Sequence, residues 1–313
     1  MALPIELSDA LTGPEVEKRL SHALDERLPF SFVRIGDGEG MALARQGGRH
    51  DPLRPSILQA FGTAYDQPRA DALGEHLDRA VGHASILGLR AEVLYLSLTA
   101  DDFKAPKDAF LLRYKRSTEG HEPAEKKHDY QSALRLAHMV FALERLGVSN
   151  ARPVSSAWVH YDLLASGYLA RLVLKAPRIG LISCRRSVAR KITTARTGPT
   201  LFFPVLEHFG REKTLGVTPE HWWQSMETVS RSLTDVRPGD VFLIGAGIWG
   251  KAYCEQVRAQ GGIAIDMGSA LDIWAGINTR PSVMPLWFEA FPDTPPGEVP
   301  RELRLESQLA ALA

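Results

Sequence analysis

Apolar and polar positions follow two periods along this chain, and segments with each period alternate. Apolar side chains recur every three or four positions over residues 14–28, which predicts a helix that begins near the capping-box sequence Thr12–Glu15. The apolar runs Phe30–Ile35 and Ser85–Leu89 predict buried strands. A further helix with one apolar face is expected to end at Gly147. The first half therefore reads as mixed helix and strand.

The second half repeats this alternation more regularly. Ser156 is expected to cap a helix of about residues 157–173. The later apolar runs predict strands over 179–183, 201–206, 241–244 and 263–267, separated by helices over 188–194, from 218 onward and over 251–260. Strands that alternate with helices indicate an α/β, Rossmann-like fold, with a mostly parallel sheet and helices on both faces.

The length of the chain allows one large α/β domain or two smaller ones. The chain has 313 residues, of which 44% are hydrophobic. We expect a single domain over residues 1–290, with a charged insertion at about 101–130 and a peripheral tail over 291–313. Lys plus Arg and Asp plus Glu both number 37, so no basic field exists to hold nucleic acid. Nucleic acid is therefore not an expected partner.

The cysteines and the N-terminal segment indicate a cytoplasmic protein. Cys184 and Cys254 are the only cysteines, and neither lies in a disulfide or zinc-type spacing. The first residues lack a basic segment followed by an apolar one, and no apolar run approaches the roughly 18 residues of a membrane span. We expect no membrane span.

The densest candidate chemistry lies directly after the strand Phe30–Ile35. There the sequence continues Gly36-Asp37-Gly38-Glu39-Gly40, preceded by Arg34 within the strand. Two carboxylates this close repel each other unless a cation lies between them, and Mg²⁺ or Mn²⁺ bound with substrate phosphates would supply that cation. A tight Asp-Gly turn is the alternative reading. Arg34 could neutralise a phosphate or pair with one of the two acids.

A glycine-rich segment, Gly245–Ala252, follows the strand over 241–244. Its GxGxxG pattern, from Gly245 through Gly247 to Gly250, stands between a strand and a helix, and Asp266 follows about twenty residues on. It also reads GxxxxGK, but Ala252 replaces the Ser or Thr of a P-loop, which excludes that class. Backbone N–H groups here could bind phosphate, with help from Lys251. The alternative is that the glycines only allow close helix–strand packing.

Three candidate segments share one topological position. Asp37, Arg185 and Gly245 each follow a predicted strand, and ligands collect at the carboxyl ends of strands in parallel sheets. Arg185 and Arg186 carry guanidinium groups suited to a diphosphate or an acidic acceptor, although solvated surface arginines would look the same. We expect these positions to share one rim.

The segment Arg34–Glu39 resembles the Arg-x-Gly-Asp-Gly-Glu sequence of GT-D-type glycosyltransferases, a group first described as a domain of unknown function in bacterial glycan and adhesin glycosylation. The stretch Val241–Gly268 is similar to that group in its order of strand, glycine loop, helix and Asp-x-Gly ending. The resemblance implies a nucleotide-sugar-dependent enzyme. It implies that Asp37 and Glu39, the D-x-E motif, are catalytic and hold Mn²⁺ or Mg²⁺.

The resulting hypothesis is a transferase that moves a sugar from a nucleoside diphosphate sugar, a UDP-sugar being favoured, to a glycan or glycoprotein acceptor. The expected substrate-binding residues are Arg34, Gly36, Gly38, Arg185, Arg186, Gly245, Gly247, Gly250, Lys251 and Asp266. An NAD(P)-dependent oxidoreductase would also use the glycine loop and Asp266, but it would leave the acidic motif without a role. A non-catalytic nucleotide-binding module is the third possibility.

Overall fold

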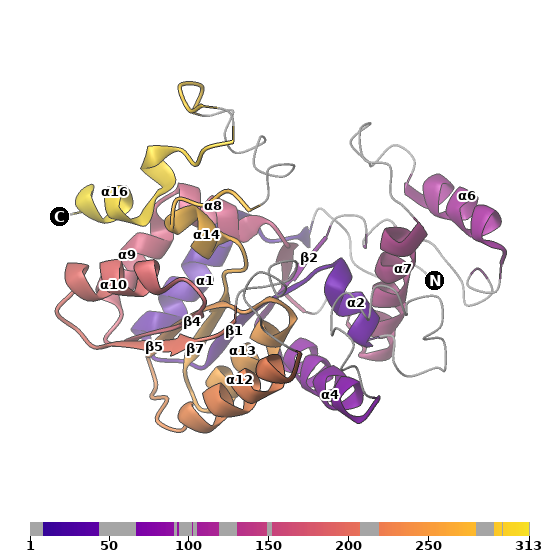
Figure 1. The fold of residues 1–313 in the computed structure, drawn as a ribbon, viewed down its shortest axis with the longest axis horizontal. Helices are drawn as coiled ribbons and strands as arrows, with labels where there is room; N and C mark the ends of the chain where they lie inside the picture. The colour runs from indigo at the N-terminus through magenta and orange to yellow at the C-terminus, as the bar shows by residue number, and fades with distance from the viewer. Residues whose placement is uncertain are drawn as a thin grey trace. The chain divides into compact units, whose positions relative to one another are not determined.

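The computed structural model describes residues 9–43, 67–90, 93, 102, 105–118, 130–148, 152–206, 219–279, 291–295 and 297–312. The chain divides into two compact units (Figure 1). Unit 1 comprises residues 1–11 and 33–157, and unit 2 comprises residues 12–32 and 158–313. This division does not test whether residues 1–290 form a single domain, which stays a prediction.

Within the described residues, seven strands run parallel in one sheet of order β3-β2-β1-β7-β6-β4-β5. Because strands that follow each other in the chain run parallel, each connection must cross back over the sheet, and the described connections contain helices. This architecture confirms the predicted α/β class. The strand bounds are β1 Phe30–Ile35, β2 Ile86–Leu89, β3 Val154–Ser156, β4 Ile179–Ser183, β5 Thr200–Pro204, β6 Val241–Gly245 and β7 Ile263–Asp266.

The register of unit 2 aligns the carboxyl ends of three strands. Ser183 at the end of β4 lies opposite Gly245 at the end of β6, and Ile244 lies opposite Asp266 at the end of β7. The segments that leave β4, β6 and β7 therefore start at the same edge of the sheet. The strand β7 lies between β6 and β1, and it pairs with residues Phe30–Phe32 of β1.

Helices cover both faces of the unit 2 strands. Figure 1 shows α12 and α13 on one side of β4 and β7, and α8, α9 and α16 on the other. This arrangement confirms the predicted helices on both faces. The helices of unit 2 are α1 Gly13–Asp25, α8 Val159–Ala165, α9 Tyr168–Lys175, α10 Arg186–Ala195, α12 Pro219–Ser232, α13 Gly250–Ala259, α14 Ala270–Trp274 and α16 Leu305–Ala310.

The capping box predicted at the start of α1 is present. The carboxylate of Glu15 accepts hydrogen bonds from the backbone N–H and the hydroxyl of Thr12, both at 2.8 Å. The backbone bond to Thr12, followed by its hydroxyl bond, lowers the pKa of Glu15. One local motif therefore fixes where the first helix begins.

The single helix expected over residues 157–173 is wrong. Ser156 belongs to β3 and does not cap a helix, and the helical segment is split into α8 and α9. Gly167 between them has φ of +70°, a left-handed conformation that glycine adopts easily and other residues rarely do. The apolar period continues across this glycine, so periodicity alone did not reveal the break.

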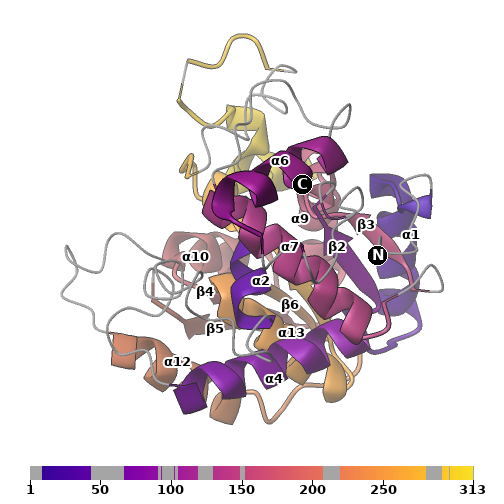
Figure 2. The same ribbon diagram turned by 90° about the vertical axis from the view of Figure 1, so that its right-hand side faces the viewer.

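Unit 1 places helices around the short strands β2 and β3. Its described helices are α2 Asp37–Leu43, α4 Gln67–His83, α6 Lys107–Thr118 and α7 Tyr130–Arg145. In Figure 2, α2 lies beside α7 and α4, which it contacts. The helix α6 falls within the charged insertion at 101–130, and its Phe110 and Tyr114 are buried.

Gly40 is the position at which α2 approaches α7 most closely. A Cβ atom at Gly40 would lie 2.2 Å from the backbone oxygen of Arg135 and 3.3 Å from the Cβ of Met139. The backbone oxygen cannot move without displacing α7. This glycine of the acidic motif therefore serves helix packing.

Gly40→Ala is expected to lower the free energy of unfolding by roughly 1–3 kcal/mol, because the added methyl overpacks the α2–α7 contact. Chemical denaturation measures the change. Gly82→Ala is the matched control, since a Cβ at Gly82 in α4 meets nothing within 4 Å. That variant should be neutral or stabilised by up to about 1 kcal/mol. Equal stability of Gly40→Ala and wild type would contradict the packing role.

The C-terminal helix α16 packs into unit 2. Gln308 is buried, accepts a hydrogen bond from the indole of Trp274 at 2.9 Å, and donates one to the backbone oxygen of Leu164 at 2.6 Å. Lys191 of α10 pairs with Glu306 at 2.5 Å. The Pro- and Glu-rich composition of this segment did not predict such packing.

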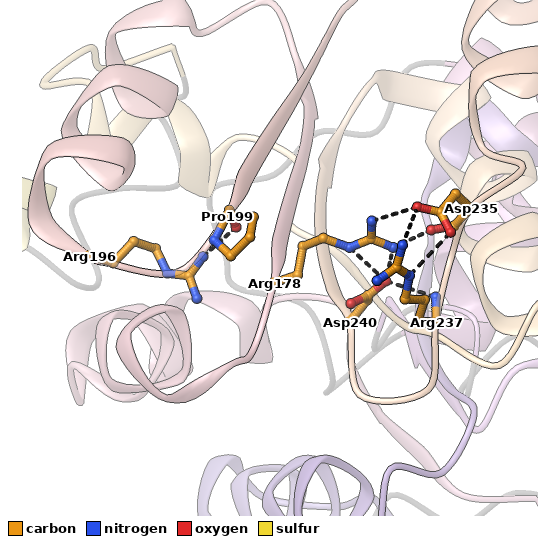
Figure 3. A network of polar contacts seen from close by, with 6 residues as sticks. All are labelled: Arg178, Arg196, Pro199, Asp235, Arg237 and Asp240. Carbon is orange, nitrogen blue, oxygen red and sulfur yellow. Dashed lines mark hydrogen bonds and ion pairs between the residues drawn. The ribbon is translucent and has the colours of Figure 1, made fainter.

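An ion-pair network joins the amino ends of β4 and β6, at the edge of unit 2 opposite to the carboxyl ends (Figure 3). Arg178, directly before β4, binds the carboxylate of Asp240, directly before β6, through two guanidinium nitrogens, and binds Asp235 at 3.0 Å. The side chains of Arg178 and Asp240 are only 12% and 4% exposed. The hydrogen bonds to Asp240 raise the pKa of Arg178 above its ordinary value.

Candidate functional site

The acidic motif forms the turn from β1 into α2. The buried carboxylate of Glu39 accepts a hydrogen bond from the backbone N–H of Gly36 at 2.8 Å. Gly36 precedes the helix and Glu39 is its third residue, so this contact is one half of a capping box. A Cβ at Gly36 would lie 3.1 Å from that carboxylate oxygen. Asp37, Gly38 and Glu39 are helical, so the alternative of a tight Asp-Gly turn is wrong, and the dipeptide begins α2 instead.

The other motif residues have different surroundings. Arg34 donates from its Nε to the backbone oxygen of Ala157 at 2.7 Å, which ties β1 to the residue after β3. Asp37 and Gly38 begin α2, and their side-chain surroundings lie outside the described part of the chain. The assignment of Asp37 and Glu39 as metal ligands, and of Arg34, Gly36 and Gly38 as substrate contacts, stays a prediction.

The donor chemistry of this turn fits a hard divalent cation. A carboxylate has about four acceptor positions, so the Gly36 bond leaves Glu39 capacity for a metal. The N-terminal turn of a helix also favours negative charge. Among the side chains that the structure describes, no group of three or more His, Cys, Asp or Glu forms a metal site. A cation held here would thus need Asp37 and ligands from the substrate.

In unit 2, the glycine segment has a packing role at two of its three positions. A Cβ at Gly245 would lie 2.6 Å from Leu271 and 3.2 Å from the backbone oxygen of Gly268, and one at Gly250 would lie 3.2 Å from Ile244. Gly247 has φ of +56° and begins a 3₁₀ turn over Gly247–Trp249 that leads into α13. The close packing that the sequence analysis gave as the alternative role of these glycines is therefore present.

Lys251 and Asp266 are paired in the interior of unit 2. The Nζ atom of Lys251 lies 3.1 Å from Oδ2 of Asp266, and the two side chains are 8% and 2% exposed. Lys251 also donates to the backbone oxygen of Gly247 at 3.1 Å. Their predicted contacts with phosphate and ribose stay predictions, because the observed contacts are with each other and with the loops.

Arg185 follows the end of β4 and binds an acid of α14, the helix that comes after β7. Its Nε donates to Asp272 at 2.6 Å, and the hydroxyl of Thr279 donates to the other oxygen of Asp272 at 2.6 Å. The exposed Arg186 lies over the ring of Phe202, 5.6 Å from its centroid. The structure therefore places Arg185, Gly245 and Asp266 at one edge of unit 2. Asp37 belongs to unit 1, so its place on a shared rim stays a prediction.

Tyr161 was not among the residues selected from the sequence. Its hydroxyl lies 2.5 Å from the hydroxyl of Ser269, in the segment that follows β7. The side chain is 3% exposed and belongs to α8. A tyrosine inside an amphipathic helix gives no sign in the sequence that its hydroxyl will contact a loop so far along the chain.

Comparison with known proteins gives one match to a family. Residues 120–274 match the sequence model of the GT-D fold-like domain. These residues are similar to the GT-D fold-like domain. This match confirms the resemblance to GT-D-type glycosyltransferases and the predicted enzyme class, a glycosyltransferase. No curated protein matches the chain.

Three solved structures are similar to the chain at low identity. A selenomethionine-substituted domain of unknown function 1792 is 14% identical with a TM-score of 0.46, covering 84% of this chain and 79% of that chain. Another structure of this domain, described as having a distinct glycosyltransferase fold, is 15% identical with a TM-score of 0.43 and the same coverage. A glycosyltransferase of this type from Streptococcus sanguinis is 14% identical with a TM-score of 0.39, covering 80% and 79%.

The matched residues of the GT-D-like domain include the unit 2 edge but end short of the acidic motif. Residues 120–274 contain Arg185, the glycine segment and Asp266, whereas Asp37 and Glu39 lie N-terminal to them. The domain match therefore supports the enzyme class. It leaves the role of the acidic motif to experiment.

The two cysteines of unit 2 provide a chemical probe of its carboxyl edge. Cys184 is half-buried at the end of β4, whereas Cys254 in α13 is fully buried. Burial, followed by the charge of Asp266, raises the pKa of Cys254 well above its ordinary value. Because the thiolate is the reactive form, Cys254 should be far less reactive.

We expect one thiol to react with Ellman's reagent in the native protein at pH 8, and two after unfolding in guanidinium chloride. Cys184→Ser should remove the native reaction and leave the second thiol in the unfolded protein. A native reaction of equal rate in Cys184→Ser would contradict the burial of Cys254.

Proposed function

We propose that this protein is a metal-dependent glycosyltransferase that moves a sugar from a nucleoside diphosphate sugar, most simply a UDP-sugar, to a glycan or glycoprotein acceptor. The observation that carries the proposal is the buried carboxylate of Glu39 in the N-terminal turn of α2, two residues after Asp37. The GT-D-like domain match supports the reaction class.

In this proposal, Asp37 and Glu39 hold Mn²⁺ or Mg²⁺ together with oxygens of the donor diphosphate. The bound ion would supply charge stabilisation to the departing nucleoside diphosphate. The capping bond from Gly36 holds the Glu39 carboxylate in one orientation before the ion binds, so less ordering is needed on binding. Arg34 and Arg186 are the proposed contacts for the remaining negative charge of the donor or acceptor.

The carboxyl edge of unit 2 is by itself a proposed anion-binding surface. Gly245 and Gly247 are half-buried and Gly250 is buried in the turn that leads into α13, where N–H groups and the helix dipole favour an anion. Arg185 is held in place by Asp272, which fixes its guanidinium at the same edge. These residues would orient the donor rather than take part in bond breaking.

An NAD(P)-dependent oxidoreductase has less support. Such an enzyme uses the acid after the second strand to bind a ribose hydroxyl. Here that acid, Asp266, is 2% exposed and is paired with Lys251. The acidic motif would also have no role.

Release of UDP from UDP-sugars tests the proposal. The wild-type protein is incubated with UDP-glucose, UDP-galactose or UDP-N-acetylglucosamine, with Mn²⁺ or with EDTA, and free UDP is measured. We expect Mn²⁺-dependent release from at least one donor, with water as the acceptor. Tight UDP binding without release, with any donor or glycan acceptor, would indicate a non-catalytic module. Nicotinamide binding that survives Asp37→Ala and EDTA would instead favour the oxidoreductase.

The partners and location follow from this proposal. Within the described residues, no helix has both the length and the apolar character needed to cross a bilayer. A donor sugar and a glycan or glycoprotein acceptor are the proposed partners, and the cytoplasm is the proposed location.

A further inference from the structure

Lys251 and Asp266 lie at the junction of two loops at the carboxyl edge of unit 2. Lys251 is the second residue of α13, which follows the glycine segment after β6, and Asp266 is the last residue of β7. Their charged atoms are 3.1 Å apart, and both side chains are almost fully buried. A buried pair of this kind needs an explanation, because its desolvation offsets most of its Coulomb attraction.

Each member of the pair also binds the backbone of a loop glycine. Lys251 donates to the backbone oxygen of Gly247, and Oδ1 of Asp266 accepts from the N–H of Gly268 at 3.2 Å. Gly247 and Gly268 have φ of +56° and +47°, so both are left-handed turns of the kind that glycine permits. The pair thus links two left-handed turns through one continuous chain of polar contacts.

The two loops are also in direct contact. The position of a Cβ at Gly245 lies 3.2 Å from the backbone oxygen of Gly268, and the N–H of Met267 donates to the oxygen of Ile244 at 2.8 Å. A shift of either loop would therefore be transmitted to the other. The ion pair fixes the separation of the two loops from inside unit 2.

We propose that Lys251 and Asp266 are positioning residues, whose ion pair holds the loops after β6 and β7 in the arrangement that receives the diphosphate of the donor. This role rests on the proposed function for its ligand, but the loop contacts themselves do not. It replaces the interpretation in which Lys251 contacts a phosphate and Asp266 a ribose. The charge of Lys251 is matched by Asp266, so the backbone of the loops provides the anion contacts.

We call the Lys251–Asp266 ion pair, with its contacts to the two loops, the clamp. Hydrogen exchange tests it independently of any ligand. In Lys251→Met, we expect amide exchange over residues 246–249 and 267–270 to accelerate by about 10-fold or more, because the Gly247 contact and the buried charge pair are both lost. Exchange in β4 should accelerate less than in the two loops, and only as far as the loss of global stability requires. Unchanged exchange in both loops would overturn the proposal.

A double variant separates positioning from simple stability. Lys251→Met with Asp266→Leu replaces the buried pair by apolar side chains, which often restores stability. We expect its melting temperature to return toward wild type while exchange at both loops stays fast, because neither glycine contact is restored. Recovery of loop protection in the double variant would contradict the clamp. Lys251→Arg, which keeps a donor and a charge, should recover part of the protection.

UDP affinity, measured by calorimetry in the presence of Mn²⁺, tests the link to function. The clamp predicts that Lys251→Met and Asp266→Asn each weaken binding by about 10-fold or more, without changing its dependence on salt. Direct phosphate binding by Lys251 predicts the opposite for Asp266→Asn, which would free the cation and tighten binding. If wild-type protein fails to bind UDP, the proposed function fails, and the exchange experiment still decides the clamp.

Discussion

Glu39→Gln is expected to abolish Mn²⁺-dependent binding of UDP while leaving the fold intact. Glutamine can still accept the N–H of Gly36, as it does in other capping boxes, so the start of α2 is preserved. The substitution removes the negative charge that a divalent cation requires. UDP release should fall by roughly two to three orders of magnitude, measured alongside the melting temperature with and without UDP and Mn²⁺.

Glu39→Ala provides the contrast for this prediction, because it removes the capping bond as well as the charge. It should lower the free energy of unfolding by about 1 kcal/mol in the absence of ligand, whereas Glu39→Gln should not. If Glu39→Gln keeps both the Mn²⁺-dependent stabilisation by UDP and UDP release, Glu39 has only the structural role.

A large loss of stability is expected for Arg178→Met. This change leaves the 4% exposed carboxylate of Asp240 without its guanidinium partner at the amino ends of β4 and β6 (Figure 3). Removing one member of a buried ion pair costs roughly 3–5 kcal/mol of unfolding free energy. The backbone N–H of Arg237 still donates to Asp240 at 2.7 Å, so the lower part of that range is expected.

Arg237→Met is the matched control in the same network. Its guanidinium binds Asp235, and the side chains are 67% and 66% exposed. An exposed pair contributes about 0–1 kcal/mol, so urea denaturation should separate the two variants clearly. Equal losses in both variants would contradict the assignment of Arg178 and Asp240 as the buried core of the network.

Much of the fold followed from short-range pattern. The strands β1 and β4 have the bounds expected from their apolar runs, and β6 and β7 differ from expectation by one residue at their carboxyl ends. The strand β3 was missed because three residues are too few to show a period. The break at Gly167 was missed because the apolar side chains on either side remain in phase.

The candidate site could be predicted only as a set of residue types. Sequence position placed Arg185 and Gly245 after strands and Asp266 near the end of one, and the register of unit 2 brings those strand ends to one edge. Sequence could not show that Lys251 and Asp266 bind each other, because the pairing depends on how α13 packs against β7. Nor could it show that Glu39 caps its own helix while remaining buried.

The account depends most on a divalent ion at Asp37 and Glu39. A crystal of the protein with UDP and Mn²⁺, measured at the manganese absorption edge, tests this directly. The account predicts an anomalous peak bonded to carboxylate oxygens of Asp37 and Glu39 and to the diphosphate, at about 2.0–2.3 Å. A peak bound to UDP but to neither carboxylate, or bound UDP with no manganese, would contradict it.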